Sequence, residues 1–201
     1  MPEVLRPSPA VAGPAAAGAR GVRLAERTEV GKIELRGDPS SRSFMAAVGR
    51  VLDIVLPTDA CTSTAKGDLA ALWLGPDAWL LTCPPGDVAF FVNSLREALE
   101  GEHHALTDVT DGRVSFRLAG PSARDVLAKG CPLDLHPRVF GAGRCASSRL
   151  AKAAVLIHLI DEDAAADPVF DLYVARSFAR YLFAWLEDAG REYGVQVDAT
   201  T

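Results

Sequence analysis

The chain has 201 residues, of which 49% are hydrophobic and 23% are charged, and its formal net charge is -5 at pH 7. This size and composition fit a packed core of one or two small domains. The acidic balance argues against nucleic-acid binding, which needs concentrated Lys and Arg, and no apolar run approaches the roughly 20 residues that span a bilayer.

The N-terminal segment, residues 1–20, is rich in Pro and Ala, and we predict that it is a disordered tail. It has no continuous apolar segment of the kind that a secretory signal contains. Residues 21–201 are expected to form one α+β domain with two possible halves, 21–103 and 104–201. The four cysteines have no paired spacing, which indicates a reducing cytoplasm rather than a disulfide framework: Cys61, Cys83, Cys131 and Cys145.

The first half carries the patterns of a strand, a helix, a hairpin and a second helix. Residues 32–36 predict the strand, and apolar residues at three- and four-residue spacing predict a helix over 44–55. Two apolar runs, 69–74 and 79–83, flank a Gly-Pro-Asp turn and indicate the hairpin. Asp87 is placed to cap the second helix. The apolar face of that helix is Val88, Phe91, Val92, Leu95 and Leu99.

The stretch 108–137 combines a turn, a strand, a helix and a rigid loop. Asp111-Gly112 is a tight-turn dipeptide, and residues 113–118 alternate polar and apolar side chains, the pattern of a half-buried strand. Gly120-Pro121 opens a helix, because Pro at the first position gives up only an unpaired N–H. The prolines of the following loop, 131–137, exclude regular structure there.

Three further strands are predicted at 145–150, 153–160 and 168–174, and an acidic loop at 161–167 precedes the last of them. The strand at 153–160 is apolar on both faces and is therefore expected inside a sheet. Ser177 is placed to cap the final helix. Its predicted apolar face, expected to pack on that sheet, is Phe178, Tyr181, Leu182, Trp185, Leu186 and Ala189.

The Cys, His and Asp residues that could bind a metal or act in catalysis also have ordinary structural interpretations. The cysteines lack the close pairs of a zinc site, and His103-His104 would point to opposite sides of a strand. His158 lies in an apolar strand, where a core histidine with its hydrogen bonds satisfied is the favoured interpretation. Asp108 and Asp111 could form an acid–base pair, although Asp at a turn commonly accepts a backbone hydrogen bond. No phosphate-binding loop, GxSxG or HExxH motif is present.

The loop from Cys131 to Gly143 is the candidate partner interface, because it is apolar for a loop and its prolines restrict its conformations. The alternative is that its side chains fold back and cover their own sheet. Arg113 and Arg117 share a strand face and are spaced to meet an anionic ligand or an acidic partner, although a solvated face is the default interpretation of such a pair. The candidate interface residues are Arg113, Arg117, Leu133, Leu135, Arg138, Val139 and Phe140.

The chain resembles the gamma subunit of heterotetrameric sarcosine oxidase from about Gly21 to Gly194, without the tail and the acidic loop. The CPLDLHP loop with the later RSFA and its helix is the most specific part, whereas LGPDAWLL also occurs in related folate-binding domains. The matching segments are LWLGPDAWLL (72–81), DVTDGR (108–113), LAGPSARDVLAKGCPLDLHP (118–137), GRCASSRLAKA (143–153) and FDLYVARSFARYLFAWLEDAGREYG (170–194).

The resemblance implies mixed or antiparallel sheets with packed helices, as in the aminomethyltransferase T-protein (folate-binding) fold. It also implies a cytoplasmic complex with alpha, beta and delta subunits, which oxidatively demethylates sarcosine to glycine. Formaldehyde or methylene-tetrahydrofolate and hydrogen peroxide are the other products. FAD, FMN, NAD, tetrahydrofolate and zinc are implied on the other subunits, and no catalytic, cofactor or metal residue of the family maps to this chain.

The expected function is therefore that of a non-catalytic structural subunit, without nucleic-acid or membrane partners. The alternatives are a free-standing folate-dependent aminomethyltransferase-like protein and a free-standing binding module. A pocket with a convergent carboxylate and a pterin-sized opening would favour the transferase. At about half the length of a full T-protein, the chain is short for that activity.

Overall fold

The computed structural model describes residues 21–161 and 167–198. The predicted disordered tail, 1–20, and residues 162–166 of the predicted acidic loop lie outside the described residues.

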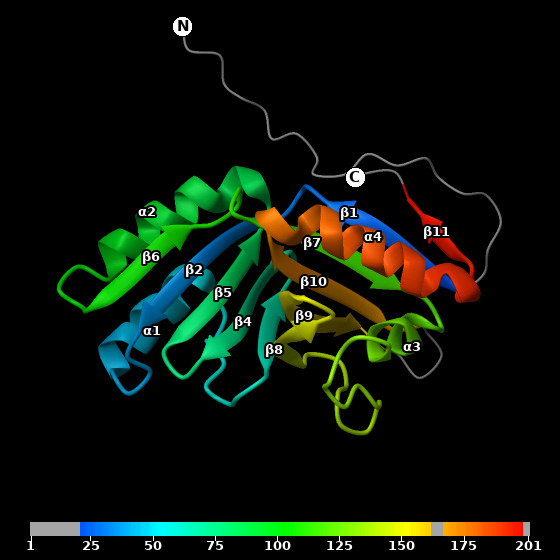
Figure 1. Ribbon diagram of the computed structural model, residues 1–201. Helices are drawn as coiled ribbons and strands as arrows, with labels where there is room; N and C mark the ends of the chain where they lie inside the picture. The colour runs from blue at the N-terminus through cyan, green and yellow to red at the C-terminus, as the bar shows by residue number, and fades with distance from the viewer. Residues whose placement is uncertain (1–20, 162–166, 199–201) are drawn as a thin grey trace, which may run out of the picture.

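The described strands form two sheets that lie next to each other (Figure 1). All neighbouring strands pair antiparallel except β1 with β11, which pair parallel. The five-stranded sheet has the order β3 (Ser63–Lys66), β4 (Leu69–Gly75), β5 (Ala78–Cys83), β2 (Gly31–Gly37) and β6 (His104–Asp108). The six-stranded sheet has the order β11 (Val195–Val197), β1 (Val22–Arg27), β7 (Arg113–Ala119), β10 (Val169–Ala175), β9 (Ala153–Asp161) and β8 (Cys145–Leu150).

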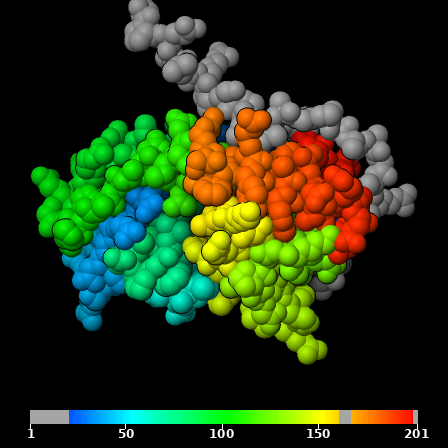
Figure 2. Space-filling view, viewed as in Figure 1, coloured from blue at the N-terminus to red at the C-terminus, as the bar shows by residue number. Residues whose placement is uncertain are grey.

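Each sheet packs one face against its own helices. Helices α1 (Arg42–Leu52) and α2 (Val88–Ala98) share a core with the five-stranded sheet, and α3 (Ala123–Ala128) and α4 (Ala179–Gly190) share one with the six-stranded sheet. Helices α2 and α4 lie along the upper edge of the space-filling view, in green and orange (Figure 2). The short 3-10 helices are η1 (Pro85–Asp87), η2 (Arg176–Phe178) and η3 (Arg191–Tyr193).

The other faces of the two sheets meet in a smaller apolar cluster that includes Leu72, Leu156 and Tyr173. Because side chains alternate along a strand, β10 directs Phe170 and Leu172 toward the helices and Tyr173 toward the other sheet. At one edge, the backbone N–H of Ser63 donates to the carbonyl of Gly143 at 2.8 Å. The two sheets are therefore joined by backbone hydrogen bonds as well as by apolar contact.

The two sheets do not divide at residue 103. Strand β1 belongs to the six-stranded sheet, whose other strands all begin at or after Arg113, and β6 completes the five-stranded sheet. The two halves thus exchange strands, and their status as domains stays a prediction. The predicted α+β class with antiparallel and mixed sheets is confirmed.

The predicted apolar face of the last helix is partly wrong. Phe178 and Tyr181 are 42% and 37% exposed and contact each other edge to face. Residues 176–178 form a 3-10 turn, so α4 begins at Ala179 rather than directly after Ser177, and its buried face is rotated. The buried residues are Ala179, Leu182, Phe183, Leu186, Ala189 and Gly190, with Trp185 partly buried beside them.

Candidate functional site

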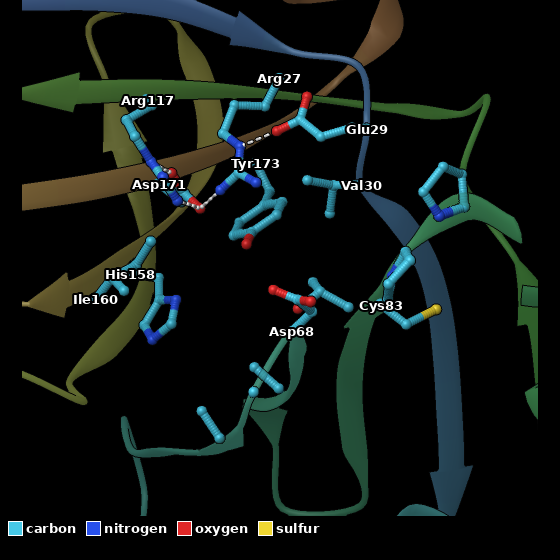
Figure 3. A pocket seen from close by; sticks show the side chains of 16 residues that line it. Arg27, Glu29, Val30, Asp68, Cys83, Arg117, His158, Ile160, Asp171 and Tyr173 are labelled. Atoms are coloured by element: carbon cyan, nitrogen blue, oxygen red, sulfur yellow. Dashed lines mark hydrogen bonds and ion pairs between the residues drawn. The ribbon is translucent and has the colours of Figure 1, made fainter. Parts of the chain in front are cut away.

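A cleft of about 510 Å³ lies between the two sheets (Figure 3). The six-stranded sheet contributes its polar side chains from β1, β7, β9 and β10. The five-stranded sheet and its turns contribute mainly small and apolar residues, among them Ala65, Ala70 and Pro84. The cleft therefore has one polar wall and one largely apolar wall.

The polar wall centres on the carboxylate of Asp171, whose side chain is almost fully buried. Arg117 donates to it from Nε at 2.8 Å and from Nη2 at 2.9 Å, and Arg27 donates from Nη1 at 3.2 Å. Arg27 also donates from Nε to Glu29 at 2.5 Å. The strand register explains why Arg117 contacts Asp171, because the two residues lie directly opposite each other in the antiparallel pair of β10 and β7.

His158 lies on the other side of Asp171, directly opposite it in the pair of β10 and β9. Its side chain is turned into the cleft (Figure 3), and its Nε2 lies 2.9 Å from the Oγ of Ser63 on β3. Burial lowers the pKa of His158 to about 4; Asp171 acts in the opposite direction, and Arg117 adds to the lowering. The imidazole is therefore neutral at physiological pH.

Two further groups of this cleft, the thiol of Cys83 and the phenol of Tyr173, are held in their neutral forms. Burial raises the pKa of the Cys83 thiol to about 11 and raises the pKa of the Tyr173 phenol above its usual value. A thiolate nucleophile and a phenolate base are thus disfavoured at neutral pH. Both carboxylate oxygens of Asp171 accept hydrogen bonds from arginine. This arrangement favours binding over acid–base or nucleophilic chemistry.

The structure separates the two arginines that were predicted to act together. Arg117 lines the cleft, whereas Arg113 donates from Nη2 to Glu34 at 3.3 Å, at the junction of β7 and β2. The two guanidiniums have different acidic partners, and only that of Arg117 lines the cleft, so Arg113 and Arg117 do not converge on one ligand there.

The loop predicted as an interface covers its own sheet in part. Leu135 and Phe140 are buried in the core of the six-stranded sheet, and Leu133 packs against that core. Arg124 holds the loop there by donating to the carbonyls of Leu135 and Phe140. The alternative weighed from the sequence is thus correct for these two side chains. Of the candidate interface residues in this loop, Arg138 and Val139 remain exposed, and their contact with a partner stays a prediction.

A family model described as "Sarcosine oxidase, gamma subunit family" matches residues 36–192. The chain belongs to this family.

Members of the gamma subunit family align with nearly the whole chain. The gamma subunit of sarcosine oxidase from Corynebacterium sp. (strain U-96) is 34% identical over 180 residues, which cover 88% of this chain and 83% of that protein. The gamma subunit from Arthrobacter sp is 35% identical over 172 residues, which cover 85% of this chain and 79% of that protein.

Solved structures show the same fold. A chain of the heterotetrameric sarcosine oxidase from Corynebacterium sp. U-96, in complex with pyrrole 2-carboxylate, superposes with a TM-score of 0.80 at 32% identity; the match covers 89% of this chain and 88% of that one. The glycine cleavage system aminomethyltransferase T from Bartonella henselae has a TM-score of 0.68 at 15% identity, over 90% of this chain and 48% of that chain. The expected likeness to the T-protein fold is confirmed.

The other candidates in this gamma-family chain have local structural roles. The Oδ1 of Asp108 accepts from the backbone N–H of Thr110 at 2.9 Å, as expected for Asp at a turn. His104 hydrogen bonds through Nδ1 to the carbonyl of Glu102 at 2.9 Å. Within residues 21–161 and 167–198, no three His, Cys, Asp or Glu side chains are grouped to hold a metal ion. The helices in these ranges are also too short or too polar to span a membrane.

Sequence reasoning missed most of the polar wall. Asp171 was assigned only to a strand, and Arg27 and Ser63 were not singled out. The detectable signal is Asp171 itself, because an aspartate between two apolar residues of a buried strand needs a partner inside the protein. The identity of that partner depends on strand order, which the sequence pattern does not reveal.

Proposed function

We propose that the chain is a non-catalytic structural subunit of a heterotetrameric sarcosine oxidase-type flavoenzyme. The complex would demethylate sarcosine oxidatively to glycine, with formaldehyde or methylene-tetrahydrofolate and hydrogen peroxide as the other products. The observation that carries the proposal is the 34% identity to a sarcosine oxidase gamma subunit over 88% of this chain. Conservation of the fold at a TM-score of 0.80 supports the same conclusion.

The structural role is supported by the chemistry of the cleft. Asp171 is bound by two guanidiniums, and burial disfavours both the charged imidazole of His158 and the thiolate of Cys83. A general acid or base needs a pKa near the operating pH. In this proposal FAD, FMN, NAD, tetrahydrofolate and zinc are held by the alpha, beta and delta subunits of a cytoplasmic complex.

The free-standing folate-dependent transferase is the less favoured function. The cleft does contain a carboxylate, but Asp171 already accepts three hydrogen bonds from arginine and is poorly placed to take a substrate N–H. The chain also spans about half the length of the aminomethyltransferase T that it resembles in fold.

Assembly and catalysis can be tested together by expressing the chain with and without its alpha, beta and delta partners. We expect a stable complex that contains the chain, and sarcosine-dependent peroxide formation only when the large subunits are present. The chain purified alone should show no flavin absorbance and no turnover of sarcosine. Turnover by the isolated chain, or failure to enter the complex, would contradict the proposal.

A further inference from the structure

The hydrogen bonds of Ser63 determine which nitrogen of His158 carries the proton. Ser63 Oγ donates its single hydrogen to the carbonyl of Gly143 at 2.8 Å. The contact of 2.9 Å between Ser63 Oγ and His158 Nε2 must therefore be donated by the imidazole. In a neutral ring the other nitrogen, Nδ1, is then an unprotonated acceptor.

This acceptor nitrogen is buried without a partner. Among the described residues no group donates a hydrogen bond to His158 Nδ1, and the residue is only 5% exposed. Figure 3 shows the ring turned toward the centre of the cleft. A buried polar atom without a partner is costly, so a donor placed in the cleft at this point would be bound favourably.

Arg27 and Arg117 each keep a guanidinium nitrogen that is not used in binding Asp171. Arg117 uses Nε and Nη2 on Asp171, and Arg27 uses Nη1 on Asp171 and Nε on Glu29. Arg117 Nη1 and Arg27 Nη2 have no hydrogen bond to another described residue. Guanidinium N–H groups bind carboxylates well because the hydrogen bonds are charge-assisted.

The distance between the arginines and His158 limits the length of a ligand that could reach both. Arg117, Asp171 and His158 occupy facing positions on three successive strands, β7, β10 and β9. Neighbouring strands are about 4.8 Å apart, so the arginine and histidine ends are separated by roughly two strand spacings at the backbone and by less at the side-chain tips. Asp68, an exposed acidic residue of the lining, disfavours a second negative charge.

We propose that the cleft binds a small organic monoanion that carries an O–H or N–H donor at the end away from its charge. The donor binds His158 Nδ1, the anionic group binds Arg27 and Arg117, and apolar residues such as Ala70 pack against the middle of the molecule. The inference concerns this chain alone and does not rest on its assembly into an oxidase.

The test is a calorimetric titration of the full-length chain with three matched probes. 4-Hydroxybenzoate has both groups at opposite ends, benzoate lacks the donor, and 4-hydroxybenzamide lacks the charge. We expect saturable binding of 4-hydroxybenzoate and at least about tenfold weaker binding of each of the other two, because each leaves one protein group unpaired. Equal binding of all three, or no binding of 4-hydroxybenzoate up to about 5 mM, would overturn the proposal.

Three variants test whether the binding site is the cleft. Ala65→Phe adds a ring at an exposed lining position, whereas Ala46→Phe adds the same ring to an exposed position of α1 that does not line the cleft. We expect only the first to abolish binding, with unchanged melting temperatures for both. Arg27→Gln keeps the two hydrogen bonds of Arg117 to Asp171 and should weaken 4-hydroxybenzoate about tenfold while leaving 4-hydroxybenzamide unaffected. Unchanged binding to Ala65→Phe would locate the site elsewhere and refute the assignment.

Discussion

Ser63 and His158 are joined by a contact of 2.9 Å although they lie 95 positions apart in the sequence. Ser63 belongs to β3 of the five-stranded sheet and His158 to β9 of the six-stranded sheet. The contact therefore links the two sheets beside the cleft, and it requires a proton on Nε2 of His158. Protonation of the ring does not break this bond, but it places a charge in a buried site.

Acid should consequently destabilise the fold through His158. The pKa of His158 is 6.5 in the unfolded chain and about 4 in the folded protein. Its contribution is fully present above pH 6.5 and is lost as the pH falls toward 4, by about 3 kcal/mol in total. Asp171 and Arg117 are the charged groups that act on the ring. Urea denaturation of the wild type and His158→Gln at pH 7 and pH 4.5 checks this, because the variant should lose less stability over that interval. An identical loss in both proteins would exclude His158 as the cause.

Asp171 should be far more important to stability than an exposed aspartate. Asp171→Asn leaves Arg27 and Arg117 without their buried counter-charge, which costs about 3–5 kcal/mol. Asp188 pairs with Arg191 in an interaction whose side chains are 74% and 79% exposed, so Asp188→Asn should cost less than about 1 kcal/mol. Denaturant unfolding of both variants measures the difference. Similar losses would show that the Asp171 network is not a buried ion pair.

Two adjacent loop residues distinguish the core from the predicted interface. Phe140 is 5% exposed and stacks with Phe170, so Phe140→Asp should cost at least about 3 kcal/mol in the isolated chain. Val139 is 54% exposed, and Val139→Asp should leave the melting temperature unchanged. If this loop face contacts a partner subunit, Val139→Asp weakens assembly in a co-purification assay. Normal assembly with Val139→Asp would argue against this part of the interface.

Gly120 should not tolerate a side chain. Its φ is +122°, and a Cβ would lie 2.4 Å from the carbonyl oxygen of Gly21. Gly120→Ala should therefore lose about 1–3 kcal/mol from backbone conformation alone, and the clash adds to this. Gly86 offers a matched control, because a Cβ there meets no heavy atom within 4 Å. Thermal unfolding should separate the two variants clearly; equal melting temperatures would contradict the geometry.

Local patterns predicted those elements whose apolar faces follow a single period. The hairpin of β4 and β5, the helix α2 and the strand β9 form as expected, and α1 forms but ends at Leu52, so that the predicted apolar residue Val55 is exposed. The sequence patterns did not predict four strands that lack a long apolar run: β1, β3, β6 and β11. Their pairing comes from distant segments, as in the parallel register of Val22 with Val195, and local propensity carries little of that information.

The candidate site depends even more on contacts between segments that are distant in the sequence. Arg117 was singled out from its place on a strand face, and its partner Asp171 lies 54 positions away. His158 was expected to be a satisfied core histidine, yet only Nε2 has a partner among the described residues. Strand order decides both results, because it sets which side chains stand opposite one another.

The exchange of β1 between the two halves has a consequence during protein synthesis. β1 is synthesised before both of its neighbours in the sheet, because β7 starts at Arg113 and β11 at Val195. The five-stranded sheet can form once β6 has been synthesised. At that stage the amphipathic β1 has no strand to pair with. Nascent chains that stop before β7 thus display an unpaired strand, the kind of edge that recruits other chains into aggregates.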